Sequence, residues 1–388
     1  MSGKNPFLGL GFGSPFTTFA RASSSSSSFS GKIIIGAERD NDSGSAAAGS
    51  VYIYNLDGTG ELKITAADAG ESDIRNDDYF GKAVAIGNNK IVVGARRQRN
   101  ESSKGAAYVF DIDGSNGFKI SPSDGAAGDY FGNSVAVGHD KIVVGSYDHN
   151  SDTGAVYVYN LDGTGELKIT ASDGATSDKF GYDVAIGHNK IVAGAYQNAA
   201  GGSRRGAVYV YDLDGTNELK ITASDGTDND KLGSAVDIGN DKIVAGASED
   251  GPGSVYVYNL DGTGEVKITA SDGASNDDFG TQVAIGNNKI GVGVVGDDPG
   301  GALYVYDLDG TNEVKITPSD SAAGDGLGWH RRVSIGGNKI AGGATGDDDD
   351  GDGSGSVYVY NLDGTGEVKI TASDGAAGAK FGSAVAIG

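Results

Sequence analysis

The sequence predicts an all-β fold, a closed seven-bladed β-propeller with four antiparallel strands in each blade. Three observations predict it. A Phe-Gly or Leu-Gly pair recurs every 47 to 54 residues, four short apolar runs lie in each interval, and 67 of the 388 residues are glycine. Repeats of this length are typical of propellers and solenoids, and many glycines fit an all-β fold with tight turns. The pairs begin at Phe80, Phe131, Phe180, Leu232, Phe279, Leu327 and Phe381.

The unit that begins at Phe180 shows the four predicted strands. They cover residues 184–186, 190–195, 208–211 and 219–222. A Gly-His-Asn-Lys turn joins the first two, and asparagine tolerates the positive φ that a tight hairpin requires. A variable loop follows the second strand, and an Asp-Gly turn joins the last two. The unit is therefore expected to form a four-stranded antiparallel sheet.

The alternation of side chains places each strand in the blade. Valine and tyrosine alternate over 208–211, so both faces are apolar, as in a strand covered on both sides by stacked sheets. Leu219 and Ile221 share one face of the last strand while Lys220 lies on the other. We therefore expect this strand to be half exposed at the outer edge, where lysine discourages edge-to-edge pairing.

The order of strands at the two ends predicts how the ring closes. Residues 32–37 repeat the second strand without a first, and residues 381–388 repeat the first strand without a second. Pairing of the two would complete one blade and leave the ring without an open blade. The propeller is accordingly assigned to residues 31–388.

The paired motifs resemble a known repeat. Phe180-Gly181 followed by Gly194-Ala195 resembles the FG-GAP repeat of integrin α-subunit heads, and the likeness extends over 31–388. The resemblance implies a propeller that acts through binding. This sequence lacks the proline that follows Gly-Ala in that family, and two-residue turns such as Asn88-Asn89 replace its calcium loop. The repeated sequence LDGTGEVKITASDGA is also similar to repeats in virion proteins of marine tailed phages.

Charge and composition exclude several classes of partner. The chain has 53 acidic and 30 basic side chains, a net charge of −23, and no cysteine. A negative surface repels phosphate backbones and anionic lipid, so we expect neither nucleic acid nor membranes as partners. Disulfides and thiolate metal sites cannot form. No run of 18 apolar residues is present, so no membrane-spanning segment is predicted.

Two acidic motifs are candidates for a divalent cation. One glycine-rich loop contains Asp347, Asp348, Asp349, Asp350 and Asp352, whose carboxylates could hold a hard cation; a solvated acidic loop is the alternative. LDGTGE and its variants have a calcium-loop form at 212–215, but Asp-Gly also suits a hairpin turn. We favour the turn, so no cofactor is expected and Ca²⁺ remains the alternative.

The loops between second and third strands vary most among the copies, and they share a face with the loops that lead into each next unit. Either this face carries recognition on a constant scaffold, or its loops drift without constraint. Its candidate binding residues are Arg96, Arg97, Arg99, Arg204 and Arg205, with His149 in the same group of loops. His139 and His188, by contrast, occupy turns of the opposite face and are interpreted as surface polar residues.

The last Leu-Gly unit is two residues longer than the others. Trp329, His330, Arg331 and Arg332 follow Leu327-Gly328 directly. Tryptophan and arginine are common anchors of contacts, so these residues are candidate binding residues. An equally supported alternative is a β-bulge whose tryptophan fills a gap between blades.

Residues 1–30 lie outside the repeat and are expected to form a docking segment. Their apolar side chains include Phe7, Leu8, Phe12, Phe16 and Phe19. Glycines and a proline interrupt the apolar run, so we expect neither a regular helix nor a cleaved secretory signal. These side chains suit an irregular strand that is laid into a groove of a partner.

The sequence points to a non-catalytic structural or binding protein. It contains no G-x-S-x-G elbow and no phosphate-binding G-x-x-x-x-G-K-[ST] loop. We expect a phage virion component in a tail or surface appendage, bound to other virion proteins through residues 1–30. Its propeller loops would contact a glycan or protein of the host surface. The alternative is a bacterial surface or secreted adhesin that binds glycans or proteins.

Overall fold

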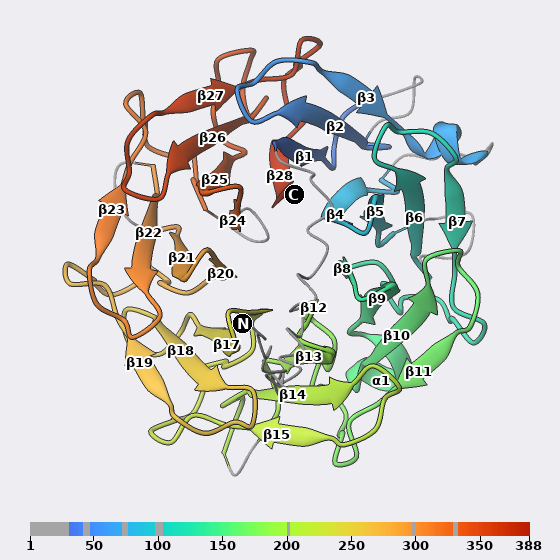
Figure 1. The fold of residues 1–388 in the computed structure, drawn as a ribbon, viewed down its shortest axis with the longest axis vertical. Coiled ribbons are helices and arrows are strands. Elements are labelled where there is room, and N and C mark those ends of the chain that lie inside the picture. The colour runs from blue at the N-terminus through green and yellow to red at the C-terminus, as the bar shows by residue number, and fades with distance from the viewer. Residues whose placement is uncertain are drawn as a thin grey trace, which may run out of the picture.

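The computed structural model describes residues 31–41, 47–71, 77–97, 104–199, 202–296, 300–328 and 333–388. These residues form seven four-stranded antiparallel sheets arranged in a ring (Figure 1). The predicted fold class, strand count and closure of the ring are confirmed. The candidate residues Arg99 and 329–332, and the whole segment 1–30, lie outside the described residues.

The first strand of every blade borders the centre of the ring, and the second strand pairs with its outer side (Figure 1). The first strands are β28 (Phe381–Ile387), β4 (Phe80–Gly87), β8 (Ser134–Gly138), β12 (Val184–Gly187), β16 (Ala235–Gly239), β20 (Gln282–Gly286) and β24 (Val333–Gly336). The second strands, in the same blade order, are β1 (Lys32–Ala37), β5 (Lys90–Ala95), β9 (Lys141–Ser146), β13 (Lys190–Ala195), β17 (Lys242–Ala247), β21 (Lys289–Val294) and β25 (Lys339–Ala344). We number the blades 1 to 7 in this order.

The third and fourth strands complete each blade toward the rim. The third strands are β2 (Ser50–Asn55), β6 (Ala106–Asp111), β10 (Ala155–Asn160), β14 (Ala207–Asp212), β18 (Ser254–Asn259), β22 (Ala302–Asp307) and β26 (Ser356–Asn361). The fourth strands are β3 (Leu62–Ile64), β7 (Phe118–Ile120), β11 (Leu167–Ile169), β15 (Leu219–Ile221), β19 (Val266–Ile268), β23 (Val314–Ile316) and β27 (Val368–Ile370). The described part of the chain adds one helical turn, α1 (His149–Asp152), and one 3₁₀ turn, η2 (Ala66–Ala69). No helix in it is long and apolar enough to cross a membrane.

The tight turns have the predicted geometry. Asn88 and Asn89 both have positive φ, 49° and 62°, and Gly87 pairs with Lys90 across the turn. Two central residues at positive φ match the twist of the flanking strands. In the Asp-Gly turns the carboxylate accepts hydrogen bonds from a threonine two residues later, as Asp57 does from the backbone N–H of Thr59 at 3.0 Å and its hydroxyl at 2.6 Å.

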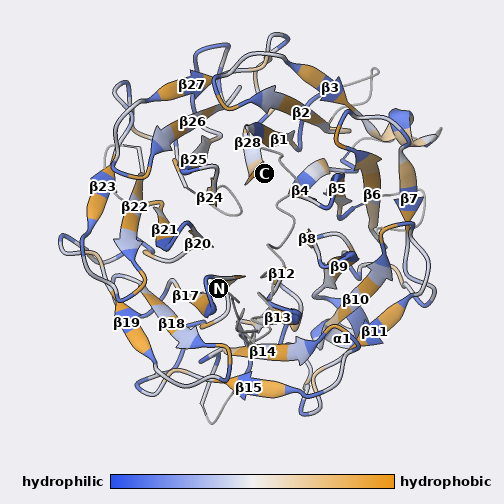
Figure 2. Ribbon diagram, in the orientation of Figure 1, coloured by the Kyte–Doolittle hydropathy of each residue, from blue (hydrophilic) through white to orange (hydrophobic). Residues whose placement is uncertain are grey.

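The core lies between blades, in seven apolar clusters, each shared mainly by two neighbours. Figure 2 shows apolar residues along the strands and polar residues in the connecting loops. In the cluster between blades 3 and 4, Phe180 contacts the ring of Tyr209 edge-on at 5.4 Å, and both are fully buried. The third strand is therefore covered on both faces, as its alternation predicts.

The Phe-Gly and Gly-Ala pairs meet across the boundary between blades. A Cβ on Gly194 of β13 would lie 2.0 Å from the carbonyl oxygen of Gly233, which follows Leu232 in the next blade. Gly233 itself has φ +87°. The same close approach recurs at all seven boundaries. Glycine is required on both sides because the two backbones touch.

The lysine of the outer strand has contacts that the alternation of side chains did not predict. Lys220 Nζ lies 2.6 Å from Asp173 Oδ2 in the preceding loop and 5.3 Å from the ring centre of Tyr209. The Tyr209 hydroxyl donates to Asp173 Oδ1 at 2.7 Å. This lysine therefore ties its blade to its neighbour, and an equivalent lysine contacts an aspartate or glutamate in every blade.

The chain ends close the ring as predicted. Strand β1 pairs with β28, with Ile35 opposite Val385. The N–H of Lys32 donates to the carbonyl of Gly388 at 3.3 Å, and the reverse bond measures 3.1 Å. Phe381, Val385 and Ile387 are buried in the cluster between blades 7 and 1. The closing blade thus has the same pairs as the other six.

Candidate binding face

The loops after each second strand and after each fourth strand lie on one face of the ring, which we call the loop face. This follows from the antiparallel order of strands, because each first strand starts there and each second strand returns to it. Arg96, Arg97, Arg204 and Arg205 all follow second strands. The shared face predicted for these arginines is thus confirmed.

Arg205 and Arg96 have different surroundings on this face. Arg205 Nε lies 3.3 Å from Asp228 Oδ1, and the two side chains are 37% and 57% exposed. It is therefore a solvated surface ion pair, which contributes little. Arg96 Nε is buried and forms no hydrogen bond with any of the described residues. Among the described residues, no contact joins the Arg205 pair to Arg96 or Arg97.

Arg97 and Arg96 belong to a continuous row of tyrosine and arginine side chains. The guanidinium of Arg97 lies 5.2 Å from the ring centre of Tyr79 and 6.0 Å from that of Tyr130. Arg39 and Arg96 also lie over Tyr79, at 6.0 and 5.8 Å. Such cation–π contacts attract the guanidinium groups to the rings.

Tyrosines extend this row across blades 3 and 4. Tyr130 stacks on Tyr147 with 5.8 Å between ring centres and 18° between planes. Tyr147 contacts Tyr182 edge-on at 5.3 Å, and Tyr182 contacts Tyr196 at 4.4 Å. We call the whole row the Tyr–Arg ladder. It consists of Arg39, Tyr79, Arg96, Arg97, Tyr130, Tyr147, Tyr182 and Tyr196.

Two phenols of the ladder, those of Tyr147 and Tyr196, stay neutral at physiological pH. Burial raises the pKa of Tyr147 and of Tyr196, since a phenolate loses hydration there. Lys179 lies 5.3 Å from the ring centre of Tyr147 and pairs with Asp148 at 2.5 Å. The ladder therefore combines these neutral rings with the guanidinium groups of its three arginines.

A polar pocket of about 220 Å³ adjoins the ladder, and we call it the vestibule. Its walls include Arg96, Tyr182, Asn133, Ser234 and Thr281. The last four directly follow the Phe-Gly or Leu-Gly pair of their unit, so they stand at the start of the innermost strands. The vestibule thus opens at the loop-face end of the ring's centre.

Sequence reasoning identified Arg96 and Arg97 but missed the five tyrosines. A signal was present in the differences among copies. Tyr79 and Tyr130 precede Phe-Gly, where other copies have Lys, Asp or Gly, and Tyr147 and Tyr196 follow the second strand, where others have Glu, Arg, Ser, Val or Thr. Their proximity could not be inferred, because it depends on how neighbouring blades are placed around the ring.

The central channel has a volume of about 230 Å³ and is lined by the first strands. Their inner edges have no further strand to pair with, and side chains of the preceding blade bind some of their N–H groups. Asp183 accepts from the N–H of Val236 at 2.9 Å, and Asp237 accepts from that of Ile285 at 2.8 Å. Burial raises the pKa of Asp237 to about 7, although its two backbone hydrogen bonds favour the charged form.

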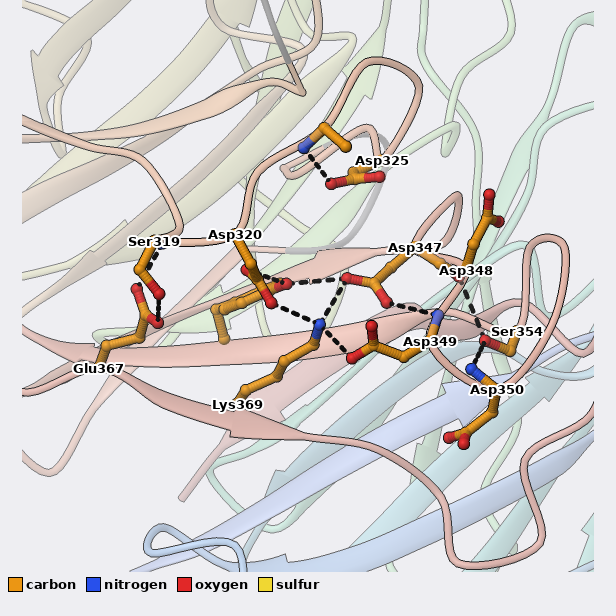
Figure 3. Close-up of polar contacts among 12 residues, drawn as sticks. Ser319, Asp320, Asp325, Asp347, Asp348, Asp349, Asp350, Ser354, Glu367 and Lys369 are labelled. Carbon is orange, nitrogen blue, oxygen red and sulfur yellow. Dashed lines mark hydrogen bonds and ion pairs between the residues drawn. The ribbon is translucent and has the colours of Figure 1, made fainter.

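The acidic loop of blade 7 surrounds a lysine (Figure 3). Lys369 Nζ lies 2.7 Å from Asp320 Oδ2, 3.0 Å from Asp347 Oδ2 and 2.5 Å from Asp349 Oδ2. These three aspartates are the only cluster of potential metal ligands in the described part of the chain. The ammonium group therefore stands where a cation would bind.

The predicted ligand set differs from this cluster. Asp347 is 5% exposed and also accepts from the hydroxyl of Tyr358 at 2.8 Å, so it is not a solvated loop residue. Asp348 accepts instead from the N–H of Gly353 at 2.7 Å. Asp348, Asp350 and Asp352 are outside the cluster, and Asp320 of the preceding loop joins Asp347 and Asp349 in it.

Residues 212–215, whose sequence has the form of a calcium loop, make a hairpin turn, which is the interpretation that the sequence favours. Asp212 binds Lys190 at 2.5 Å, and Asp214 accepts from Thr216. The only other nearby acid, Glu218, accepts from Tyr211 and from the neighbouring blade's Ser172. Each carboxylate therefore has a structural partner.

The histidines occupy different environments. His139 is exposed in its turn, and His188 Nδ1 lies 3.0 Å from Asp241 Oδ1. The expectation that these two are surface polar residues is confirmed. His149, in contrast, is buried, with Nδ1 2.8 Å from Asp129 and Nε2 2.6 Å from Lys168. It stabilises the boundary between blades and does not belong to the exposed loop surface.

Comparison with known families agrees with the repeat seen in the fold. The FG-GAP repeat matches residues 59–110, 116–159, 164–211, 216–258, 263–306, 311–360 and 365–388. Each full match begins just before a fourth strand and ends within or just after the third strand of the next blade. A repeat therefore straddles two blades, and the last match is completed by β1 and β2. No curated protein matches the chain.

Proposed function

Because the chain belongs to the FG-GAP repeat family, we propose that this propeller is a non-catalytic binding protein that presents its loop face to a ligand. The observation that supports this most is the Tyr–Arg ladder, which spans several blades of an otherwise repetitive scaffold. Tyrosine and arginine are the side chains most often found at the energetic centres of interfaces. A closed ring holds them rigidly, so binding costs little ordering entropy.

We further propose that the chain is a component of a phage virion, in a tail or surface appendage. Residues 1–30 would dock to other virion proteins, and the loop face would contact a host glycan or protein. The similarity of the repeat sequence to repeats in virion proteins of marine tailed phages supports this assignment. The proposal includes neither nucleic acid nor membrane as partner, since the net charge of −23 repels both.

The docking role of residues 1–30 is tested in purified particles. Mass spectrometry should detect the chain among the structural proteins. A chain that begins at Gly31 should fold with an unchanged melting temperature and be absent from particles. Normal incorporation would assign the docking surface to the propeller instead.

The bacterial adhesin is the second candidate. It shares the loop-face binding role but places the chain on a cell surface or outside the cell. Fractionation of a producing bacterium separates the two assignments, because an adhesin would be found at the surface of uninfected cells. In either case Tyr130→Ser and Tyr147→Ser should abolish attachment to target cells. Asn240→Ser, in an opposite-face turn, should leave attachment intact.

A further inference from the structure

From the vestibule and the adjoining ladder we infer the chemical class of the ligand, a carboxylate-bearing sugar of the uronic acid type within a polysaccharide chain. This inference rests on the proposed binding role of the loop face and names what that face binds. Three features of the site support it independently: an arginine whose buried Nε has no hydrogen-bond partner among the described residues, walls that can accept hydrogen bonds, and flat aromatic rings beside them.

The cation is Arg96. Arg96 lines the vestibule, and its buried Nε has no hydrogen-bond partner among the described residues, although its charge also acts on Asp148. The other basic side chain of the vestibule, Lys82, is already bound to Glu38 at 3.1 Å. A carboxylate is the acceptor that matches a guanidinium best, because two of its N–H groups can bind the two oxygens. The ligand should therefore carry an anionic oxygen group.

The hydroxyl groups of the walls have their donors occupied. Ser234 donates to the carbonyl of Gly246 at 3.3 Å, and Thr281 donates to that of Asp278 at 2.5 Å. A hydroxyl oxygen keeps lone pairs after donating its hydrogen, so both can still accept. Asp183 adds a carboxylate to the same walls. Groups of this kind fit a ligand that brings its own O–H donors, as a sugar ring does.

The ladder provides the apolar part of the site. Tyr182 lines the vestibule and also contacts Tyr147 and Tyr196. A sugar ring has an apolar face of C–H groups that can pack on such rings, while its hydroxyls point outward. The vestibule, at about 220 Å³, is smaller than the ~300–1,000 Å³ sites of drug-sized ligands. It therefore suits one sugar unit, and the ladder gives a path for the next units of the chain.

The distribution of charge favours a carboxylate-bearing polysaccharide over neutral glycans and over polyanions in general. The chain as a whole has a net charge of −23, which repels an extended polyanion. Arg39, Arg96 and Arg97 gather beside one tyrosine, so the attraction is confined to a small area. A polysaccharide with a carboxylate on a sugar ring satisfies the arginines and the hydroxyl acceptors together.

The test is calorimetric binding of short oligogalacturonate, with malto-oligosaccharide as the neutral probe and dextran sulfate as the polyanion probe. Wild-type protein should bind oligogalacturonate and neither of the others. Arg96→Gln should weaken binding by at least about tenfold, as expected for the loss of a charged hydrogen bond. Arg205→Gln is the matched control, because its arginine lies on the same face and already has Asp228 as partner. It should leave binding unchanged.

Tyr182 provides a second pair of variants. Tyr182→Phe should retain binding and Tyr182→Ser should lose it, since the ring and not the hydroxyl packs on the sugar. Melting temperatures show that each variant folds. Equal binding of all three probes, no binding of oligogalacturonate, or equal loss in Arg96→Gln and Arg205→Gln would overturn the inference. If that happens while Tyr130→Ser still abolishes attachment to cells, the face binds another ligand and the proposed function stands.

Discussion

At the scale of single residues, glycine determines how closely the blades approach. Gly343 of β25 faces the carbonyl oxygen of Gly382, and a Cβ there would lie 2.0 Å from it. Its neighbour Gly342 faces only the methyl ends of Leu303 and Leu327. Equivalent positions in β5 and β13 hold Val93 and Ala193, so a side chain is accommodated there in other blades. Two adjacent glycines thus have different reasons to be present.

Gly343→Ala should destabilise the protein by about 3 kcal/mol or more, because backbone atoms must move to relieve the overlap. Gly342→Ala is the control and should cost well under that, since leucine side chains can shift. Urea unfolding curves of both variants measure the difference. Similar free energies of unfolding for the two would show that the boundary between blades 7 and 1 is looser than the structure indicates.

Asp237 gives a second residue-scale prediction, which concerns pH. Asp237 and Asp183 are the titratable side chains among the described residues that line the channel. The folded state raises the pKa of Asp237 to about 7, above its value in the unfolded chain, through burial first and the charge of Asp183 in addition. The stabilising contribution of this group is thus present in full below pH ~4 and is lost as pH rises through about 7.

We therefore expect Asp237→Asn to gain stability relative to wild type between pH 5 and pH 8, by about 2–4 kcal/mol. Asparagine cannot ionise, so it avoids placing a charge at this position. Thermal melts across this pH range measure the effect. Asp241→Asn, at an exposed turn, should show no such trend. A parallel pH dependence of Asp237→Asn and wild type would rule out the raised pKa.

At the scale of elements, neighbouring blades are joined by polar contacts as well as by the apolar clusters. In most blades the loop after the fourth strand contributes a serine and an aspartate to the next blade. Ser172 donates to Glu218 Oε1 at 2.6 Å, and Asp173 binds both Lys220 and Tyr209. Exposed ion pairs contribute little singly, and the side chain of Asp173 is 49% exposed, but this aspartate also accepts a hydrogen bond from the buried Tyr209. Together these contacts join each blade to the next around the ring.

Blade 7 shows what the lysine of this arrangement does. Lys369→Met would leave Asp320, Asp347 and Asp349 facing one another, and their mutual repulsion should lower the melting temperature. Added Ca²⁺ should restore part of the loss, since carboxylate oxygens are its preferred ligands. Wild-type protein should respond neither to Ca²⁺ nor to a chelator. A chelator-dependent melt of wild type would mean that a cation competes with Lys369.

The sequence was sufficient to predict the strands and turns, but it was insufficient to predict the contacts between them. Strand order, turn type and closure follow from a pattern that is local and repeated seven times, so each copy supports the others. The contacts of Lys220 with Asp173 and of Tyr147 with Tyr182 join residues of different repeats. Their geometry depends on the angle between blades, which hydrophobic periodicity does not encode. For this reason the arginines of the loop face were identified and its tyrosines were not.

At the scale of the whole molecule, the repeat and the blade are out of phase. The matched repeat 59–110 contains β3 of blade 1 and β4, β5 and β6 of blade 2. Each repeat therefore leaves an unpaired strand at both ends until its neighbours fold. At the chain ends, β28 of the last match pairs with β1, and β3 of the first match pairs with β2. Closure is thus the same pairing of first and second strand that every other blade makes.

Equivalence of the closing joint predicts a viable circular permutant. Gly388 and Lys32 pair as Gly87 and Lys90 do, and in the latter pair Asn88-Asn89 makes the turn. Joining Gly388 to Lys32 through Asn-Asn, and opening the chain between Asn287 and Asn288, should preserve the ring. Its melting temperature should lie within a few degrees of that of residues 31–388, because termini at an exposed turn break few contacts.

The opposite test of closure is a truncated chain that ends at Lys380 and therefore lacks β28. It exposes the inner edge of β1 and removes Val385 and Ile387, at ~1.5–3 kcal/mol for each buried side chain, together with the ladder hydrogen bonds. Because domain stability is only ~5–15 kcal/mol, most of it should be lost. Thermal melts of the permutant and of the truncated chain show whether β28 holds the ring closed or is an end strand that contributes little to stability. A truncated chain that melts with the full-length protein, or a permutant that does not fold, would show that the ring is not held at this joint.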